Sequence, residues 1–200
     1  MAIEFIPYIA LFPDWNEVHP QVEIIPHFRV NDHFNFSYDF FYSSDINNRG
    51  YGTTLSDNSD VFGRRTITTA SNTFTFNYVF NSKMNVSLKL RHYRSQLVYK
   101  KYYVLLNDGS MSPMEAFSQN LDENYNVFTT DFLYTWEFMP GSFFNIIWKY
   151  NVQQSDSGIY DTYYDNLKKT ADSPISNLLA LKISFYLDYQ TIKNFLTKNS

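Results

Sequence analysis

Charged side chains with the potential for chemistry alternate with aromatic residues along several segments of the chain. Asp131 and Glu137 share one such segment, and paired carboxylates are the residues that cleave glycosidic bonds. Their separation along an extended strand is roughly 20 Å, because each residue advances the chain by about 3.3 Å. A glycosidase needs about 5–10 Å between its carboxyl groups. We therefore do not expect Asp131 and Glu137 to form a glycosidase site.

The histidines show none of the spacings that hold a metal ion. His19, His27, His33 and His92 are scattered, and the chain has no cysteine to complete a ligand set. The sequence also lacks a Gly-x-Ser-x-Gly elbow and a glycine-rich phosphate or dinucleotide loop. We therefore predict no catalytic residue, no metal and no cofactor. A hydrolase with a Ser/His pair is a distant alternative.

Two kinds of polar segment carry side chains that suit a ligand. Residues 56–60 offer carboxylate and amide oxygens, which suit calcium, but they lack the spacing of a calcium-binding loop. A solvated turn is the simpler interpretation. Tyrosines clustered elsewhere could stack on sugar rings, or could pack together and hold loops in place. They are Tyr99, Tyr102 and Tyr103, and then Tyr160, Tyr163 and Tyr164.

The elements that must position these side chains are strands. In residues 34–42 aromatic residues occupy every second position, with polar residues such as Asn35 and Asp39 between them. A period of two is the period of a strand, because successive side chains point to opposite faces of a sheet. The same alternation recurs and predicts strands near residues 3–12, 22–31, 34–42, 67–80, 84–100, 125–138, 143–151 and 178–190.

Composition and loop lengths indicate that these strands form a transmembrane barrel. Aromatic residues make up 20% of the chain, yet the mean hydropathy is −0.36, and no apolar run is long enough for a membrane-spanning helix. Short turns at Asn31, Asn81 and Pro140 alternate with long polar loops, expected near 13–20, 43–65 and 151–176 and around 110. We predict an all-β fold, an antiparallel up-and-down transmembrane β-barrel with about seven to eight strands here.

The alternation assigns each residue a side, with apolar residues facing lipid and polar residues facing the lumen. After His92 and Arg94 the lipid side turns polar, which marks where that strand leaves the hydrocarbon. The residues expected at the membrane interface are Tyr42, His92, Trp136 and Trp148. The charged residues expected to line the lumen, either paired and hydrated or guiding a solute, are Asp39, Lys89, Arg91, Asp131, Glu137, Lys149, Lys182 and Asp188.

The alternative is a soluble lipocalin-like barrel or β-sandwich with its apolar faces inside. The aromatic content and the one-sided loop lengths argue against it. The net charge of −4, without a clustered basic face, argues against a nucleic-acid partner. The first residues lack the basic and apolar regions of an export signal, and the absence of cysteine fits either an exported or a cytosolic protein.

Several aromatic motifs resemble a family of Gram-negative outer-membrane proteins. These proteins carry an N-terminal carbohydrate-binding module of family 9 type followed by a C-terminal barrel domain of unknown function. The resemblance implies that this chain is the last part of a larger barrel, with the module and the export signal upstream. It transfers no functional residues. The matching segments are residues 62–65, 76–84, 90–93, 134–138, 140–142 and 181–190.

The functional expectation is an outer-membrane barrel section that transports or binds at the surface, with a link to carbohydrate through the upstream module. A structural or anchoring barrel with a plugged lumen and a soluble ligand-binding barrel are the alternatives. The expected partners are outer-membrane lipid, the machinery that inserts barrels, and carbohydrate. The last strand, whose apolar face ends at Tyr189, is expected to be the signal for insertion.

Overall fold

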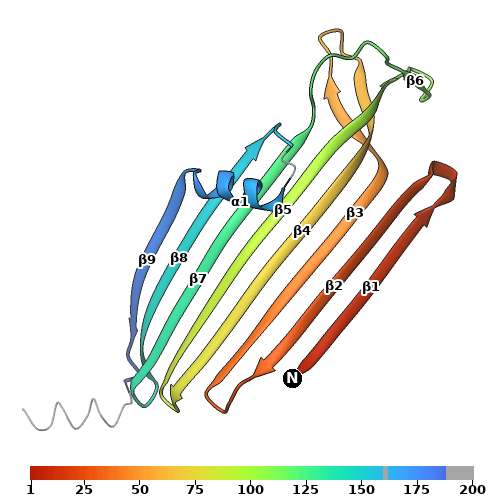
Figure 1. Cartoon of the computed structure of the whole chain (residues 1–200). Helices are drawn as coiled ribbons and strands as arrows, with labels where there is room; N and C mark the ends of the chain where they lie inside the picture. Colours follow the sequence, from red (N-terminus) through yellow and green to blue (C-terminus); the bar gives the residue numbers. More distant parts are fainter. Residues whose placement is uncertain (160–161, 188–200) are drawn as a thin grey trace, which may run out of the picture.

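The computed structural model describes residues 1–159 and 162–187, which form one long antiparallel sheet with a short helix against it (Figure 1). The strands are β1 (Ala2–Phe12), β2 (Glu17–Arg29), β3 (Phe34–Thr54), β4 (Asp60–Asn81), β5 (Met84–Leu105), β6 (Met111–Pro113), β7 (Glu123–Met139), β8 (Ser142–Asp156) and β9 (Ile175–Ser184). The helices are the 3₁₀ turn η1 (Pro13–Trp15) and the α-helix α1 (Tyr163–Ala171).

The sheet has up-and-down topology. Its strand order is β1-β2-β3-β4-β5-β7-β8-β9, every neighbouring pair is antiparallel, and the short β6 adds to the far end of β5. The prediction of an all-β, antiparallel up-and-down fold is confirmed. Within the described residues the sheet is open, with β1 and β9 at opposite edges (Figure 1).

The register brings the predicted apolar positions together on one face. One row across the sheet consists of Phe28, Phe36, Phe76, Leu88, Phe132, Trp148 and Leu179. We call the face that carries this row the aromatic face. The next row carries Ser37, Thr75, Lys89, Asp131 and Lys149 and points to the opposite side, which we call the charged face.

The aromatic face is exposed instead of being packed into a core. Among the described residues the buried apolar side chains are Val61 and Val152 alone. Trp148 is 39% exposed and Leu181 is 65% exposed. Neighbouring rings contact each other along the face, as in the stacked pairs Phe28–Phe36 at 4.7 Å and Tyr38–Phe74 at 4.4 Å between ring centroids. The rings form a continuous apolar surface along this face.

The central strands are longer than the sequence predicted. A loop was expected over residues 43–65, and this was wrong, because β3 continues to Thr54 and β4 begins at Asp60. Backbone pairing continues there with polar side chains, through a bulge where Asn47 adopts a left-handed conformation with φ 59°. The 22 residues of β5 span about 70 Å, well beyond the thickness of a bilayer.

Two other expected loops also contain regular structure. Residues 13–20 were predicted to be a loop, but η1 turns the chain and β2 begins at Glu17. The segment 151–176 was predicted to be a loop, but β8 runs to Asp156 and α1 follows. The predicted turns at Asn31, Asn81 and Pro140 are confirmed. The expected end of the last strand, with Asp188 and Tyr189, lies outside the described residues.

Candidate functional site: a pocket under the helix

Helix α1 lies against the sheet and contacts β7 and β8 (Figure 1). Its hydrogen bonds to Asn72 and Asn126 place it on the aromatic face. It begins at a Thr162 N-cap, whose hydroxyl accepts a hydrogen bond from the Asp165 amide. Tyr163, Asn166 and Thr170 follow the spacing of one helical face and contact the sheet side. The helix is therefore positioned by a capped start and by polar side chains.

A cluster of buried amides attaches the helix to β7 and β8. Asn166 is fully buried, and its Oδ1 accepts hydrogen bonds from the amide nitrogens of Asn124 at 3.1 Å and Asn126 at 2.8 Å. Its own amide nitrogen donates to Asn124 Oδ1, and Asn126 also donates to Gln154. Asn124 and Asn126 share the face of Phe128 and Phe132, so the same face of β7 changes from aromatic to amide.

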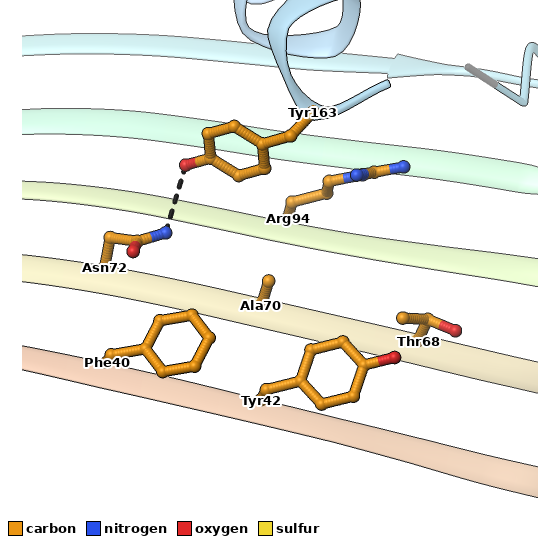
Figure 2. Close-up of a pocket in the computed structure, with 7 residues that line it drawn as sticks. All are labelled: Phe40, Tyr42, Thr68, Ala70, Asn72, Arg94 and Tyr163. Atoms are coloured by element: carbon orange, nitrogen blue, oxygen red, sulfur yellow. Dashed lines mark hydrogen bonds between the residues drawn. The ribbon is translucent and has the colours of Figure 1, made fainter. Parts of the chain in front are cut away.

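A cavity of about 350 Å³ lies beside this cluster, between α1 and strands β3 to β5 (Figure 2). Its floor is built from three successive cross-strand rows of the aromatic face. The rings of Phe40 and Tyr42 and the cationic side chain of Arg94 stand around a small central residue, Ala70. The lining residues are Phe40, Tyr42, Thr68, Ala70, Asn72, Arg94 and Tyr163.

A chain of polar contacts ties the helix to the floor of the pocket. The Tyr163 hydroxyl accepts a hydrogen bond from Asn72 Nδ2 at 3.0 Å and contacts the Nδ1 of His92. The Tyr38 hydroxyl in turn donates to Asn72 Oδ1. Burial of its hydroxyl, with the nearby Tyr38, raises the pKa of Tyr163 above its usual range. This tyrosine therefore remains a neutral hydrogen-bonding group at physiological pH.

The lining of this pocket suits an amphiphile. Within the described residues His92 contacts the Tyr163 hydroxyl through Nδ1, and its buried Nε2 has no hydrogen-bond partner. In the described residues no group of three or more His, Cys, Asp or Glu side chains is placed to hold a metal ion. Aromatic rings beside one guanidinium suit a molecule with an apolar part and an anionic part.

The predicted lumen residues lie on the opposite face from this pocket. Lys89, Asp131 and Lys149 are cross-strand neighbours in one row, and the Lys149 ammonium lies 3.5 Å from Asp131. Asp39 and Arg91 flank Thr73 in another row, and Lys182 pairs with Asn145. Glu137 instead accepts a hydrogen bond from the Gly141 amide and stabilises the β7–β8 turn. Asp188 lies outside the described residues.

Of the residues expected at the membrane interface, His92 needs correction. It is 5% exposed and lies beneath α1, because Tyr163 covers it from the segment expected to be a loop. Trp136 and Trp148 are exposed on the aromatic face, and Tyr42 lines the pocket. None of the helices in the described residues is both long and apolar enough to cross a membrane.

The sequence left two interpretations open for the tyrosine clusters and for residues 56–60, either ligand binding or a structural role. Tyr99 stacks on Tyr102 at 5.2 Å, and Tyr102 contacts Phe117 at 4.4 Å, so these rings pack on one another. Tyr163 joins the pocket, Tyr164 is exposed, and Tyr160 lies outside the described residues. In residues 56–60 the Asp57 carboxylate accepts a hydrogen bond from the Ser59 amide, as in an ordinary Asx turn.

Sequence reasoning missed the pocket, although two signals for it were present. Asn124 and Asn126 continue the alternation of Phe128, so an extended strand carries them on the same face as Phe128. Thr162 and Asp165 carry the spacing of a helix start, and Tyr163, Asn166 and Thr170 that of one helical face. A helix this short depends on tertiary contacts, and sequence alone does not reveal those.

Fold and site together define the class: an all-β protein made of one antiparallel up-and-down sheet, with an exposed aromatic face and a helix over one end of it. The family described as Domain of unknown function (DUF5916) matches residues 1–196, and the chain belongs to this family. The match supports the resemblance to a domain of unknown function. No curated protein and no solved structure matches the chain.

Proposed function

We propose that this chain is a section of an outer-membrane β-barrel whose aromatic face contacts lipid and whose charged face lines a polar interior. In this proposal the barrel transports a solute or binds one at the cell surface. The carbohydrate-binding module implied by the sequence resemblance makes a carbohydrate the first candidate solute. The barrel-insertion machinery would then recognise the last strand.

The observation that carries the proposal is the exposed aromatic face. Row after row of rings and aliphatic side chains crosses β2 to β9, and no side chain of the row that runs from Phe28 to Leu179 is buried. A soluble sheet buries such a face, since apolar surface removed from water contributes about 25 cal/mol per Å². Helix α1 covers one end of this face, where it is hydrogen-bonded to Asn72 and Asn126. Lipid is the environment that suits the uncovered rows.

The unpaired edges of the sheet also support the proposal of a barrel. Within the described residues, β1 and β9 each have a sheet partner on one side only. Unpaired backbone groups are not tolerated in hydrocarbon, and closed barrels remove such edges. The proposal therefore includes pairing of β1 and β9 with further strands that complete the barrel.

The charged face supports a hydrated interior. Asp131 is 45% exposed and Lys149 is 59% exposed, although they face each other as an ion pair. Such side chains are costly against lipid and ordinary in a water-filled lumen. A densely packed, anchoring barrel is the competing function, and it predicts that these side chains are inaccessible to water-soluble reagents.

Paired cysteine labelling in intact outer membranes tests the proposal. The chain has no cysteine, so each introduced thiol is the only one it contributes. Three pairs of single-cysteine variants place the thiol at neighbouring positions on opposite faces: L88C and K89C, F132C and D131C, and W148C and K149C. A membrane-impermeant maleimide should label the charged-face member of each pair and spare the aromatic-face member until detergent is added.

The alternatives give different results. Labelling of neither member before detergent would support the plugged, anchoring barrel. Recovery of the protein in the soluble fraction, without detergent, would overturn the membrane proposal. Equal labelling of both members in washed membranes would overturn the assignment of the two faces.

A further inference from the structure

Strands β3, β4 and β5 extend beyond the rest of the sheet and carry a row of cations there (Figure 1). The pairing of β7 with β5 ends at Leu97, and the pairing of β2 with β3 ends at Ile46. Past these points Arg49 pairs with Arg64, and Arg64 pairs with Lys101. Cross-strand neighbours point to the same face, so three like charges stand side by side and repel one another. An anion lying over the row would remove this cost.

The next row towards the tip of these strands carries aromatic rings on the same face. Tyr51 pairs with Phe62, and Phe62 pairs with Tyr103. The rings of Tyr51 and Phe62 meet edge to face, with 6.0 Å between their centroids. Rows on one face are two residues apart, so the rings lie about 7 Å from the cations. A cationic row and an aromatic row therefore form one surface.

Two cavities open on this surface, one of about 340 Å³ and one of about 260 Å³. They share Arg64 and Tyr103, and the larger cavity also reaches the Phe62 ring. No carboxylate lines either of them. The cationic side chains in their walls are Arg49, Arg64, Lys100 and Lys101.

The turn η1 holds both arginines in place. The Arg49 guanidinium lies over the Trp15 ring, 4.0 Å from its centroid. The Nη1 atom of Arg64 donates to the main-chain oxygens of Trp15 at 2.5 Å and Asn47 at 3.0 Å. Rings and main-chain carbonyls are uncharged, so these contacts orient the guanidinium groups and leave their net charge in place. Within the described residues none of the four cations forms an ion pair.

Asp60 limits the site at its outer end. It lies on the same face, one row beyond the rings and about 13 Å along β4 from Arg64. Its carboxylate accepts a hydrogen bond from the Thr54 hydroxyl at 2.6 Å. The anionic groups of a ligand are therefore expected over the cations, and its uncharged part over the rings.

Three further carboxylates belong to neighbouring segments, and none of them lines the two cavities. One is in η1, one accepts hydrogen bonds from the amide and hydroxyl of Ser110, and one lines a separate cavity on the other side of the two lysines. They are Asp14, Asp108 and Glu115, in that order.

The height of the row favours a ligand dissolved in water over a lipid. Arg64 is ten residues along β4 from Phe74, the last ring of that strand on this face before the cation. Ten residues span about 33 Å, and a strand tilted by about 45° then rises more than 20 Å along the membrane normal. The headgroup layer of a bilayer is about 5–8 Å thick on each side. In the proposed barrel the row therefore stands beyond the headgroups.

We propose that this end of the sheet binds an acidic saccharide, a sugar chain that carries carboxylates. The carboxylates contact the row of Arg49, Arg64 and Lys101, and the sugar rings pack on Phe62 and Tyr103. The inference rests on the proposed surface-binding function and deepens it by naming the substrate class and its site. Guanidinium groups bind carboxylates through paired, charge-assisted hydrogen bonds. The apolar face of a sugar ring gains contact area on an aromatic ring, which a small anion does not use.

The test is calorimetric titration of the purified full-length protein in detergent with three probes: tetragalacturonate, its uncharged methyl ester and tetraglutamate. Wild type should bind tetragalacturonate at least tenfold more tightly than either of the others. R49Q/K101Q removes two exposed cations of the row and should weaken this binding about tenfold or more. Y103L should weaken it severalfold. K168Q/K169Q removes the same charge from the exposed side of α1 and should leave binding unchanged.

Other outcomes overturn the inference, provided that the variants keep the melting temperature of the wild type. Absence of tetragalacturonate binding at millimolar concentration would remove the site. Equal binding of the methyl ester would show that charge plays no part, and equal binding of tetraglutamate would identify an anion site without preference for sugars. Equal losses in R49Q/K101Q and K168Q/K169Q would reduce the effect to net charge.

Failure of this site and failure of the proposed function are distinguishable. Binding that is lost in K89Q/R91Q and kept in R49Q/K101Q would place the saccharide on the charged face. The site proposed here would then be wrong, and a barrel that takes up a solute would stand. Failure of the membrane proposal shows as protein recovered in the soluble fraction, whatever the titrations give.

Discussion

The aromatic face has two halves, which are formed by the same strands and differ in their side chains and in whether a helix covers them. In the half near the short turns, positions such as Phe74, Trp136 and Leu181 are apolar and exposed. In the half beyond His92, the same positions carry Arg94, Asn124 and Asn126, and a helix covers them. The strands continue unbroken across the boundary. Strand pairing therefore does not depend on the type of side chain here. The change from apolar to polar side chains marks the boundary between the two halves.

The largest effect is expected from a charge placed in the uncovered half. L88R puts a cation on the aromatic face among the rings, and V98R puts one on the same face and strand beyond the pocket. If lipid contacts only the first half, L88R should lower the free energy of unfolding by about 2–4 kcal/mol, and V98R by about 1 kcal/mol or less. Urea unfolding in lipid vesicles measures both.

The matched control for L88R is S87R, which adds the same charge one residue away on the charged face. It should cost little, because that face is proposed to be hydrated. Equal losses for L88R and V98R would remove the distinction between the two halves. Equal losses for L88R and S87R would remove the distinction between the two faces.

The next effect concerns the helix-covered half. N166A removes the side chain that bonds to both Asn124 and Asn126 and leaves their amides buried without it. Each orphaned polar group costs about 1–3 kcal/mol, so α1 should detach while the sheet remains folded. Hydrogen exchange should then rise in residues 162–171 and stay unchanged in β3 to β5. K168A, at an exposed position of the same helix, should leave exchange unaltered. Exchange that rises across the whole sheet would contradict this local picture.

A smaller and pH-dependent effect is expected at Tyr163. Its pKa is raised in the folded state, so the folded protein holds the phenol proton more tightly than the unfolded chain does. The resulting stabilisation is complete below the ordinary tyrosine pKa of about 10 and is lost as the pH rises through the higher folded value. A bimane label on Y164C, an exposed neighbour, should report release of α1 above about pH 10.

Y163F provides the control for that titration. It removes the hydroxyl that accepts from Asn72, so it should weaken helix docking by about 0.5–1.5 kcal/mol at neutral pH. It should also abolish the Tyr163-dependent part of the pH profile. A profile identical in wild type and Y163F would show that another group controls helix release.

The half that the sequence predicted well is the half where burial preferences are strongest. Alternation in residues 34–42 and the turns at Asn31, Asn81 and Pro140 identified the strands and the face of each side chain, because a one-residue slip would exchange the two faces. Beyond Ser43, residues 44–54 are mostly polar on both faces of β3. A pattern based on hydropathy has no contrast there, although backbone hydrogen bonding continues through Thr54 and Asp60.

The pocket was beyond the reach of sequence patterns for a different reason. Its residues come from β3, β4, β5 and α1, and the contact between Asn72 and Tyr163 joins positions that are 91 residues apart. Each residue is unremarkable alone, and only the register and the docked helix bring them together. The predicted lumen residues shared one strand face and were therefore easier to group, although whether they line a lumen is still a prediction.

The smallest effect is expected from the ion pair on the charged face. Measuring it tests whether this face is hydrated, in contrast to the aromatic face. Asp131 and Lys149 lie 3.5 Å apart and are both well exposed, so in water their pairing contributes about 0.2–1 kcal/mol. A double-mutant cycle with D131N and K149Q should give a coupling in this range that falls with added salt. A coupling of several kcal/mol that is insensitive to salt would mean that this face is dry. The interior would then be packed, and the anchoring barrel would replace the transporting one.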